Sequence, residues 1–154
     1  MKHSFILAIV VAIFSGFAAY GAELDFGDQG SGTITVKAWK ALDAQKYADA
    51  IGYAKKCVEL YEKQALEMQK SLKEPVNGDD KDAVNAKWAL NDVGTCLYIV
   101  GQANEKQDKN KEALESYKKL AEKFSFAQCW DPQGWFWKPA EAAKERIEEL
   151  EKKK

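Results

Sequence analysis

Histidine is almost absent from this 154-residue chain, because its only histidine is His3. His3 lies in a segment that we expect to be removed on export, so the mature protein would contain none. A chain without histidine cannot use a Ser-His-Asp or Cys-His mechanism, and it lacks the commonest zinc ligand. The sequence also lacks a phosphate-binding loop, a nucleophile elbow and any cluster of metal ligands. We therefore expect a protein that is not an enzyme and that takes no cofactor and no metal.

An excess of charge of either sign is also missing, since 23 basic residues stand against 24 acidic ones. A nucleic-acid-binding domain usually carries a basic excess, so we expect no nucleic-acid partner. Most acidic side chains stand beside lysines, as in the segments EKQALEMQK and KERIEELEKKK. This pattern is typical of solvent-exposed helix faces rather than of paired catalytic carboxylates.

Long apolar runs are lacking too, and the one near the N-terminus, Phe5–Phe14, is too short to cross a bilayer comfortably. A short positive segment precedes it and small residues follow, as in a secretory signal peptide. We predict a signal peptide over residues 1–21, with cleavage after Ala18 or Gly21; the alternative is an uncleaved membrane anchor. No cysteine lies near these sites, which argues against a lipoprotein anchor. The mature protein is expected to be exported, periplasmic or secreted, and not integral to the membrane.

The three cysteines, Cys57, Cys96 and Cys129, allow one disulfide in an oxidising compartment, and the sequence leaves the pairing open. Cys57 occupies a core position of a predicted helix, and Cys96 lies beside a similar apolar stripe. Both are therefore equally well explained as small buried hydrophobes. The competing prediction is a disulfide that involves Cys129.

Apolar residues recur at steps of three and four along most of the remaining chain, which predicts amphipathic helices. The most regular stripe runs from Tyr47 to Leu72 and predicts one long, straight helix. About five helices are expected in all. Their expected ranges are Ile34–Ala44, Tyr47–Leu72, Asp82–Gln107, Lys111–Phe124 and a last helix that begins at Pro139.

Polar residues mark the boundaries of these helices. Asp79 or Asp80 is expected to cap the third helix and Asn110 the fourth, because their side chains can accept from free N–H groups of a first turn. The glycine-rich segment over residues 22–32 is predicted to be a flexible linker. The helical domain would then cover residues 33–154.

Small and aromatic residues occupy matching places in two predicted helical hairpins. In the later hairpin they are Leu97, Val100 and Gly101, then Ala113, Tyr117 and Leu120; in the earlier one they are Tyr47, Ala50, Ala54 and Cys57. This pattern resembles the tetratricopeptide repeat (TPR), an antiparallel helical hairpin that recognises proteins. The equivalent residues Ala50 and Ala113 are 63 positions apart. Tandem repeats recur about every 34 residues, so the middle helices would be elongated.

The resemblance implies an all-α fold of stacked antiparallel hairpins in a short right-handed superhelix, closed by a C-terminal capping helix. It also implies an inner, protein-binding surface lined by the first helix of each hairpin. On that surface we place Trp39, Tyr98, Gln102, Glu105 and Lys106 as candidate partner contacts, with Thr35 and Asp43 nearby. The alternative for these residues is an ordinary solvated helix face.

Aromatic residues near the C-terminus depart from any helical period. Trp130, Trp135, Phe136 and Trp137 flank a predicted β-turn over residues 131–134. We favour a plug that packs under the last helix, since exposing several large aromatics together is costly. The alternative is an exposed platform for a partner or a sugar ring. The segment is also similar to the endings of exported bacterial TPR proteins, a likeness that implies no activity.

We thus expect a non-enzymatic module for protein–protein interaction or assembly in the cell envelope. The alternative function is carbohydrate or cell-wall binding through the tryptophan-rich segment 129–137, with a glycan as the partner.

Overall fold

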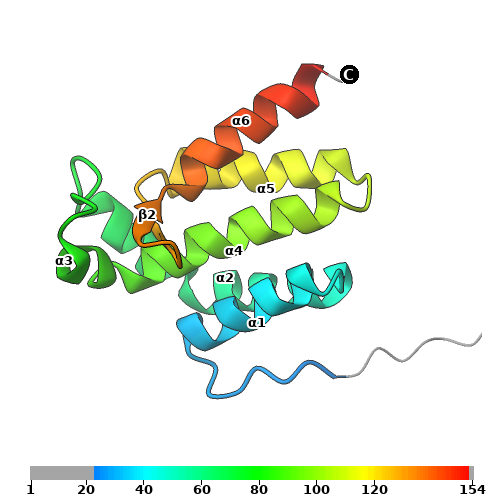
Figure 1. Cartoon of the computed structure of the whole chain (residues 1–154), viewed down its shortest axis with the longest axis horizontal. Helices are drawn as coiled ribbons and strands as arrows, with labels where there is room; N and C mark the ends of the chain where they lie inside the picture. The colour runs from blue at the N-terminus through cyan, green and yellow to red at the C-terminus, as the bar shows by residue number, and fades with distance from the viewer. Residues whose placement is uncertain (1–22, 153–154) are drawn as a thin grey trace, which may run out of the picture.

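The computed structural model describes residues 23–152, and the predicted signal peptide over residues 1–21 lies outside them (Figure 1). Within the described residues the chain forms six helices and one two-stranded sheet. In chain order these are α1 (Ser31–Asp43), α2 (Tyr47–Lys70), α3 (Lys81–Asn85), α4 (Trp88–Glu105), α5 (Asn110–Lys123), β1 (Cys129–Asp131), β2 (Trp135–Trp137) and α6 (Pro139–Lys152). The molecule is therefore mostly helical, as the periodicity predicts.

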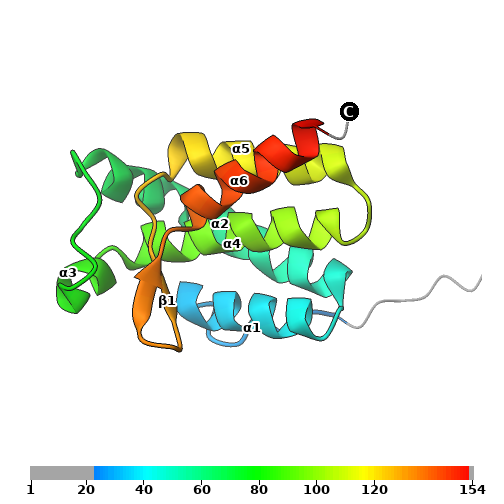
Figure 2. The same ribbon diagram turned by 45° about the horizontal axis from the view of Figure 1, so that its top comes forward.

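Helix α4 lies at the centre of the molecule and packs against α1, α2, α5 and α6. Figure 1 shows α1, α4, α5 and α6 one above another, and the turned view in Figure 2 shows α2 passing behind α4. The short connections between α1 and α2 and between α4 and α5 make each pair antiparallel neighbours. The long seam between α2 and α4 joins the two pairs.

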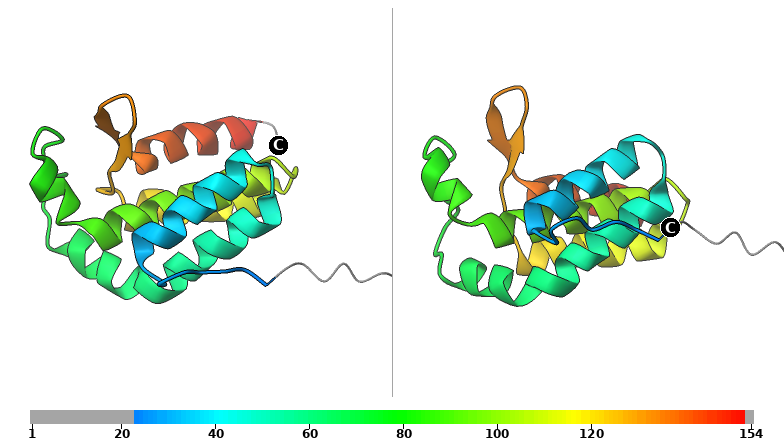
Figure 3. Two further views of the ribbon diagram at one scale, coloured as in Figure 1. Left: turned by 60° about the horizontal axis from the view of Figure 1, so that its bottom comes forward. Right: turned by 90° about the horizontal axis from the view of Figure 1, so that it is seen from below.

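The segment before α1 packs on the helices although its glycines predict a flexible linker. Phe26 meets the ring of Tyr53 edge to face at 5.6 Å, and the Tyr61 hydroxyl donates to the Gln29 carbonyl at 2.8 Å. Figure 3 shows this segment running back across the first two helices. Helix α1 begins at Ser31, three residues before the predicted start at Ile34 and inside the predicted linker.

The single helix predicted over residues 82–107 is interrupted, and this prediction is wrong. Helices α3 and α4 are separated at Ala86 and Lys87. The Asn91 amide nitrogen donates to the Val84 carbonyl at 2.8 Å, and its oxygen accepts from the Gln128 N–H at 2.9 Å. A side chain that takes a backbone carbonyl in this way competes with the helical hydrogen bonds.

The two predicted caps have opposite outcomes. Asp80 is the N-cap of α3, and its carboxylate accepts from the Ala83 N–H at 3.0 Å, as expected. Asn110 is the first residue of α5 rather than its cap, and this prediction is wrong. Lys109 stands at the cap position of α5 with no side-chain hydrogen bond to the first turn.

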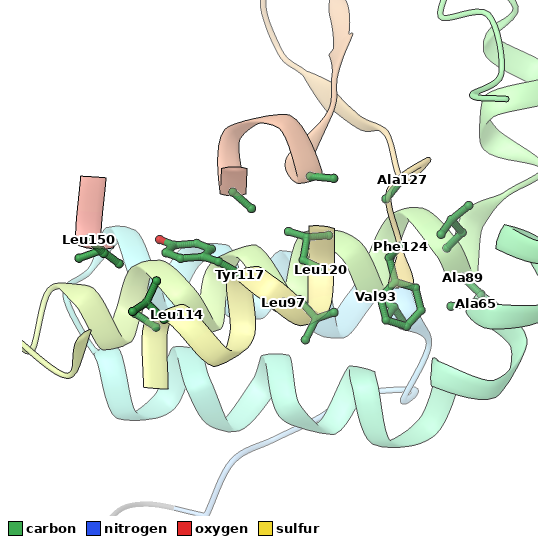
Figure 4. Close-up of a cluster of buried hydrophobic side chains, with 14 residues drawn as sticks. Ala65, Ala89, Val93, Leu97, Leu114, Tyr117, Leu120, Phe124, Ala127 and Leu150 are labelled. Atoms are coloured by element: carbon green, nitrogen blue, oxygen red, sulfur yellow. The ribbon is translucent and has the colours of Figure 1, made fainter. Parts of the chain in front are cut away.

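Two apolar cores lie on either side of α4. The first, drawn in Figure 4, gathers side chains of α2, α4, α5 and α6, and its largest fully buried members are Tyr117, Phe124, Leu90, Leu120 and Val93. The second lies between α1, α2 and α4 and includes Ile34, Ala38, Ala50, Ala54 and Ile99. Burial of each large side chain contributes about 1.5–3 kcal/mol, so these stripes supply most of the driving force for packing.

Helices α4 and α5 approach closely where α4 has a glycine. A Cβ atom added to Gly101 would overlap the Tyr117 ring, which is fully buried. One turn away, the Ser116 hydroxyl donates to the Leu97 carbonyl at 2.7 Å. The small residue therefore has a packing role, because the aromatic ring fills the space that a side chain would need.

The strands β1 and β2 form an antiparallel hairpin with Trp130 opposite Phe136. Its turn has the predicted form: the Gly134 N–H donates to the Asp131 carbonyl at 2.9 Å, and Gly134 has a φ of +114°. The turn is thus confirmed, while the strand pairing around it departs from a purely helical chain. Among residues 23–152, none of the helices combines the length and the apolar character needed to span a bilayer.

Candidate interaction face

Helices α1 and α4 together line two cavities, and their residues at these cavities are here called the α1/α4 face. It comprises Thr35 and Trp39 on α1, with Thr95, Gln102 and Lys106 on α4. The two positions on α1 are four residues apart, and the positions on α4 lie seven and eleven residues beyond Thr95, so each set lies on one side of its helix. Thr35 and Thr95 are only 6% and 2% exposed, so the accessible part of this face is formed by Trp39, Gln102 and Lys106.

The first cavity, of about 440 Å³, lies at the end of the face remote from the hairpin. Its lining residues are Trp39, Leu42, Asp43, Gln45, Tyr47, Gln102 and Lys106. Three of the predicted partner contacts, Trp39, Gln102 and Lys106, therefore meet here. Trp39 and Gln102 are half-buried and Lys106 is exposed, which places an aromatic ring among polar groups at the surface.

Two other predicted partner contacts on α4, Glu105 and Tyr98, instead contact side chains of neighbouring elements of the protein. Glu105 accepts from the Tyr117 hydroxyl at 3.2 Å and from Arg146 Nε at 3.1 Å. Tyr98 is half-buried, with its ring 5.7 Å from that of Tyr117 and 5.2 Å from that of Trp137. These residues face α5, α6 and the hairpin. Burial raises the pKa of Tyr117, with the Glu105 charge adding to the effect, so the hydroxyl keeps its proton for this bond.

The second cavity, of about 250 Å³, lies between the hairpin and the starts of α1 and α4. Its lining residues are Thr35, Asn85, Trp88, Asn91, Asp92, Thr95, Gln128, Cys129, Trp130 and Phe136. Three aromatic side chains thus stand beside several polar groups. Trp130 also carries the Lys81 ammonium group 4.6 Å from its ring centroid.

Asp92 is the charged side chain in this second cavity. Burial raises the pKa of its carboxyl group, while the Ser31 hydroxyl, which donates to it, acts in the opposite direction. Asp92 was not among the residues predicted from the sequence, because an acidic residue on a helix usually faces solvent. Its burial could have been predicted from its position four residues before Cys96, on a helix whose neighbouring positions are almost all apolar or small.

The aromatic cluster around the hairpin divides into half-buried and exposed members. Trp137 packs on Tyr98, as the plug interpretation predicts for the whole cluster. Trp130 and Trp135 remain 42% and 50% exposed, and Trp88 of α4 is 39% exposed. Phe136 is half-buried as well, so the plug interpretation holds in part, for Phe136 and Trp137, while Trp130 and Trp135 present apolar surface to solvent.

The cysteines are free thiols, with Cys57 and Cys96 buried and Cys129 partly exposed. In the part of the chain that the structure describes, His, Cys, Asp and Glu side chains form no group of three that could hold a metal ion. Comparisons of the chain with models of protein families, with curated proteins and with solved structures found no match. The features of this protein that point to a function are therefore the α1/α4 face and its two cavities.

Proposed function

We propose that this protein is a non-enzymatic interaction module that binds an extended segment of a partner protein on the α1/α4 face. The observation that carries the proposal is the meeting of Trp39, Gln102 and Lys106 around the larger cavity. A half-buried aromatic residue surrounded by polar groups is typical of interface hot spots.

The dimensions of the face support an extended ligand. Thr95 and Lys106 are eleven residues apart on α4, a separation of about 16 Å along a helix axis. An extended chain covers this distance with about five residues. The two cavities would accept side chains of such a segment, and Trp39 would contact the end of the segment that occupies the larger cavity.

We further propose that α1 with α2, and α4 with α5, are TPR-type hairpins stacked in a right-handed superhelix, with α6 as the capping helix. The close approach of Gly101 to Tyr117 supports this assignment, because the resemblance places a small residue and an aromatic residue at those positions. An exported location, periplasmic or secreted, follows from the signal peptide proposed for residues 1–21. A scaffold for envelope assembly would fit that location.

The test is affinity capture from the extracytoplasmic fraction with three immobilised forms of the protein. These are the unchanged protein, Trp39→Ala, and Val36→Ala, a matched control on α1 that is 52% exposed and lines neither cavity. We expect one protein to be retained by the first and third forms and lost from the second. Its affinity, measured by calorimetry, should fall at least tenfold with Trp39→Ala, or about 1.4 kcal/mol. Equal retention by all three forms, or no retained protein, would refute the proposal.

A second candidate function is glycan binding at the hairpin cavity. The specific observation in its favour is that Trp88, Trp130 and Phe136 line one cavity together with the Asp92 carboxylate. Sugar rings stack on aromatic faces, and their hydroxyl groups donate to carboxylates. Titration with soluble glycans should then change the tryptophan fluorescence, and Trp130→Ala should abolish the change. A flat response with every glycan would remove this candidate and leave the first proposal untouched.

A further inference from the structure

Two buried thiols from different helices meet beneath α1. Cys57 belongs to α2 and Cys96 to α4, and neither side chain is exposed. The Thr35 hydroxyl oxygen lies 3.8 Å from Cys57 Sγ and 3.3 Å from Cys96 Sγ. Because both sulfurs contact one oxygen atom, they are less than about 7 Å apart.

Loss of the two thiol protons would leave the other buried polar groups around these sulfurs with their hydrogen bonds. The Thr35 hydroxyl donates its single proton to the Ser31 carbonyl at 2.8 Å. The thiols are then the donors toward Thr35 Oγ1, and Cys57 Sγ also lies 4.0 Å from the Ser31 carbonyl oxygen. A disulfide contains no donor, so its formation would leave no buried donor without an acceptor.

The third cysteine lies in a different environment. Cys129 is on β1, and its Sγ contacts the Trp130 carbonyl oxygen of the same strand at 3.8 Å. Its neighbours include Thr95 and Trp137, near the exposed hairpin. In the folded protein, Cys57 and Cys96 are therefore the cysteines brought together by packing.

We propose that Cys57 and Cys96 form the disulfide of this protein, joining α2 to α4 beneath α1, and that Cys129 remains a free thiol. The oxidant is a disulfide, either a small-molecule one or that of a thiol oxidoreductase. The first protein thiolate attacks this disulfide and releases one thiol, leaving a mixed disulfide. The second thiolate then displaces the other thiol. Two protein thiols become one S–S bond, and the oxidant takes up two electrons and two protons as two thiols.

The reaction belongs to the folding stage of the protein. In the folded state both sulfurs are closed off by the core, and burial, followed by the neighbouring Cys57 thiol, raises the pKa of Cys96 well above its usual range. A buried neutral thiol is a poor nucleophile. The pair therefore reacts before α1 covers it, and the bond is then protected from reductants by the same packing.

The test uses the full chain, unfolded under reducing conditions and refolded with a mixture of reduced and oxidised glutathione. Free thiols are then alkylated, and the peptides are mapped without reduction. We expect a peptide that links Cys57 to Cys96, with alkylation at Cys129. The midpoint of thermal unfolding should rise by roughly 10 °C relative to the protein refolded with a reductant alone.

Cys129→Ser is the matched control, and it should retain both the linked peptide and the rise in the unfolding midpoint. A linkage that includes Cys129 would overturn the proposal. So would three alkylated cysteines in a chain that has regained its helical circular dichroism. The linked peptide and the alkylation pattern are both measured on the unsubstituted protein, so the test does not depend on a core variant being able to fold.

Discussion

Arg146 on α6 forms an ion pair with Glu105 near the end of α4, and its Nε and Nη2 groups donate to both carboxylate oxygens. The Tyr117 hydroxyl of α5 donates to the same carboxylate at 3.2 Å. One side chain thus links three helices and holds α6 in place. The Glu105 side chain is only 18% exposed, so solvent screens the pair incompletely.

Removal of this carboxylate should loosen the C-terminal helix. We expect Glu105→Ala to lower the free energy of unfolding by about 2 kcal/mol, since the buried end of Tyr117 loses its acceptor and Arg146 its partner. Glu105→Gln keeps an acceptor for Tyr117 and should cost about half as much. Urea unfolding measures both. Glu149→Ala, which removes the more exposed partner of Arg146, is the control and should cost less than about 0.5 kcal/mol. Equal losses for Glu105→Ala and Glu149→Ala would contradict the linking role.

Two helical glycines should respond in opposite directions to the same substitution. Gly101→Ala inserts a methyl group into the Tyr117 ring and should destabilise the protein by about 2–3 kcal/mol, despite the better helix propensity of alanine. At Gly32 of α1, the nearest atom to an added Cβ is Asp92 Oδ2 at 4.0 Å. Gly32→Ala should therefore stabilise the protein by about 0.5–1 kcal/mol. Denaturant midpoints that shift the same way in both variants would show that packing does not distinguish these sites.

The N-terminal ends of α3 and α5, one capped by a side chain and one not, offer a second matched pair of substitutions. Asp80→Ala removes the acceptor of the Ala83 N–H and should cost about 1 kcal/mol. Asn110→Ala removes no cap, so its effect should stay within about 0.5 kcal/mol. Hydrogen exchange at the Ala83 amide gives a local readout, and it should accelerate only in the Asp80 variant. An unchanged rate there would argue against the cap.

Stability should depend on pH through Asp92. Its pKa is raised by burial in the folded protein, from a value near 3.8 in the unfolded chain. The folded state therefore holds this proton more tightly. The stabilisation is complete below about pH 3.8 and is lost as the pH rises through the folded value. Asp92→Asn, which keeps an acceptor for Ser31, should be more stable than the unchanged protein at pH 7.

The stability difference between Asp92→Asn and the unchanged protein should shrink toward zero when the urea unfolding is repeated below pH 4. Asp79→Asn, in the exposed loop before α3, is a control with no burial to relieve. A gain for Asp92→Asn that is the same at both pH values would mean that titration of this carboxyl does not affect stability.

The helices were predictable because their signal is local. Tyr117 and Phe124 are seven residues apart, or about two helical turns, and the structure buries both completely. The interruption between α3 and α4 was not predictable, because it involves Asn91 and Gln128, which are 37 positions apart. The pairing of Glu105 with Arg146 spans 41 positions and could not be predicted from the sequence for the same reason.

The same distinction applies to the candidate site. Helical spacing was enough to place Trp39, Gln102 and Lys106 on faces that the structure brings together at one cavity. Helical spacing could not show that Glu105, one position before Lys106, contacts other helices instead of a partner. Its role depends on Arg146, which belongs to another helix. The turn at Gly134 was readable from residue type. Which tryptophans around that turn are covered depends on the position of Tyr98, far away in the sequence.

The packed segment at residues 23–30 has a practical consequence for producing this protein. A recombinant form that starts at Thr33 would strip the Phe26 ring from Tyr53 and the Gln29 carbonyl from Tyr61. It would also delete Ser31, and with it the donor to Asp92 and the carbonyl that accepts from Thr35. A recombinant form that begins before Glu23 keeps all of these contacts. An affinity tag fused at that end can then be cleaved off without removing residues of the packed segment.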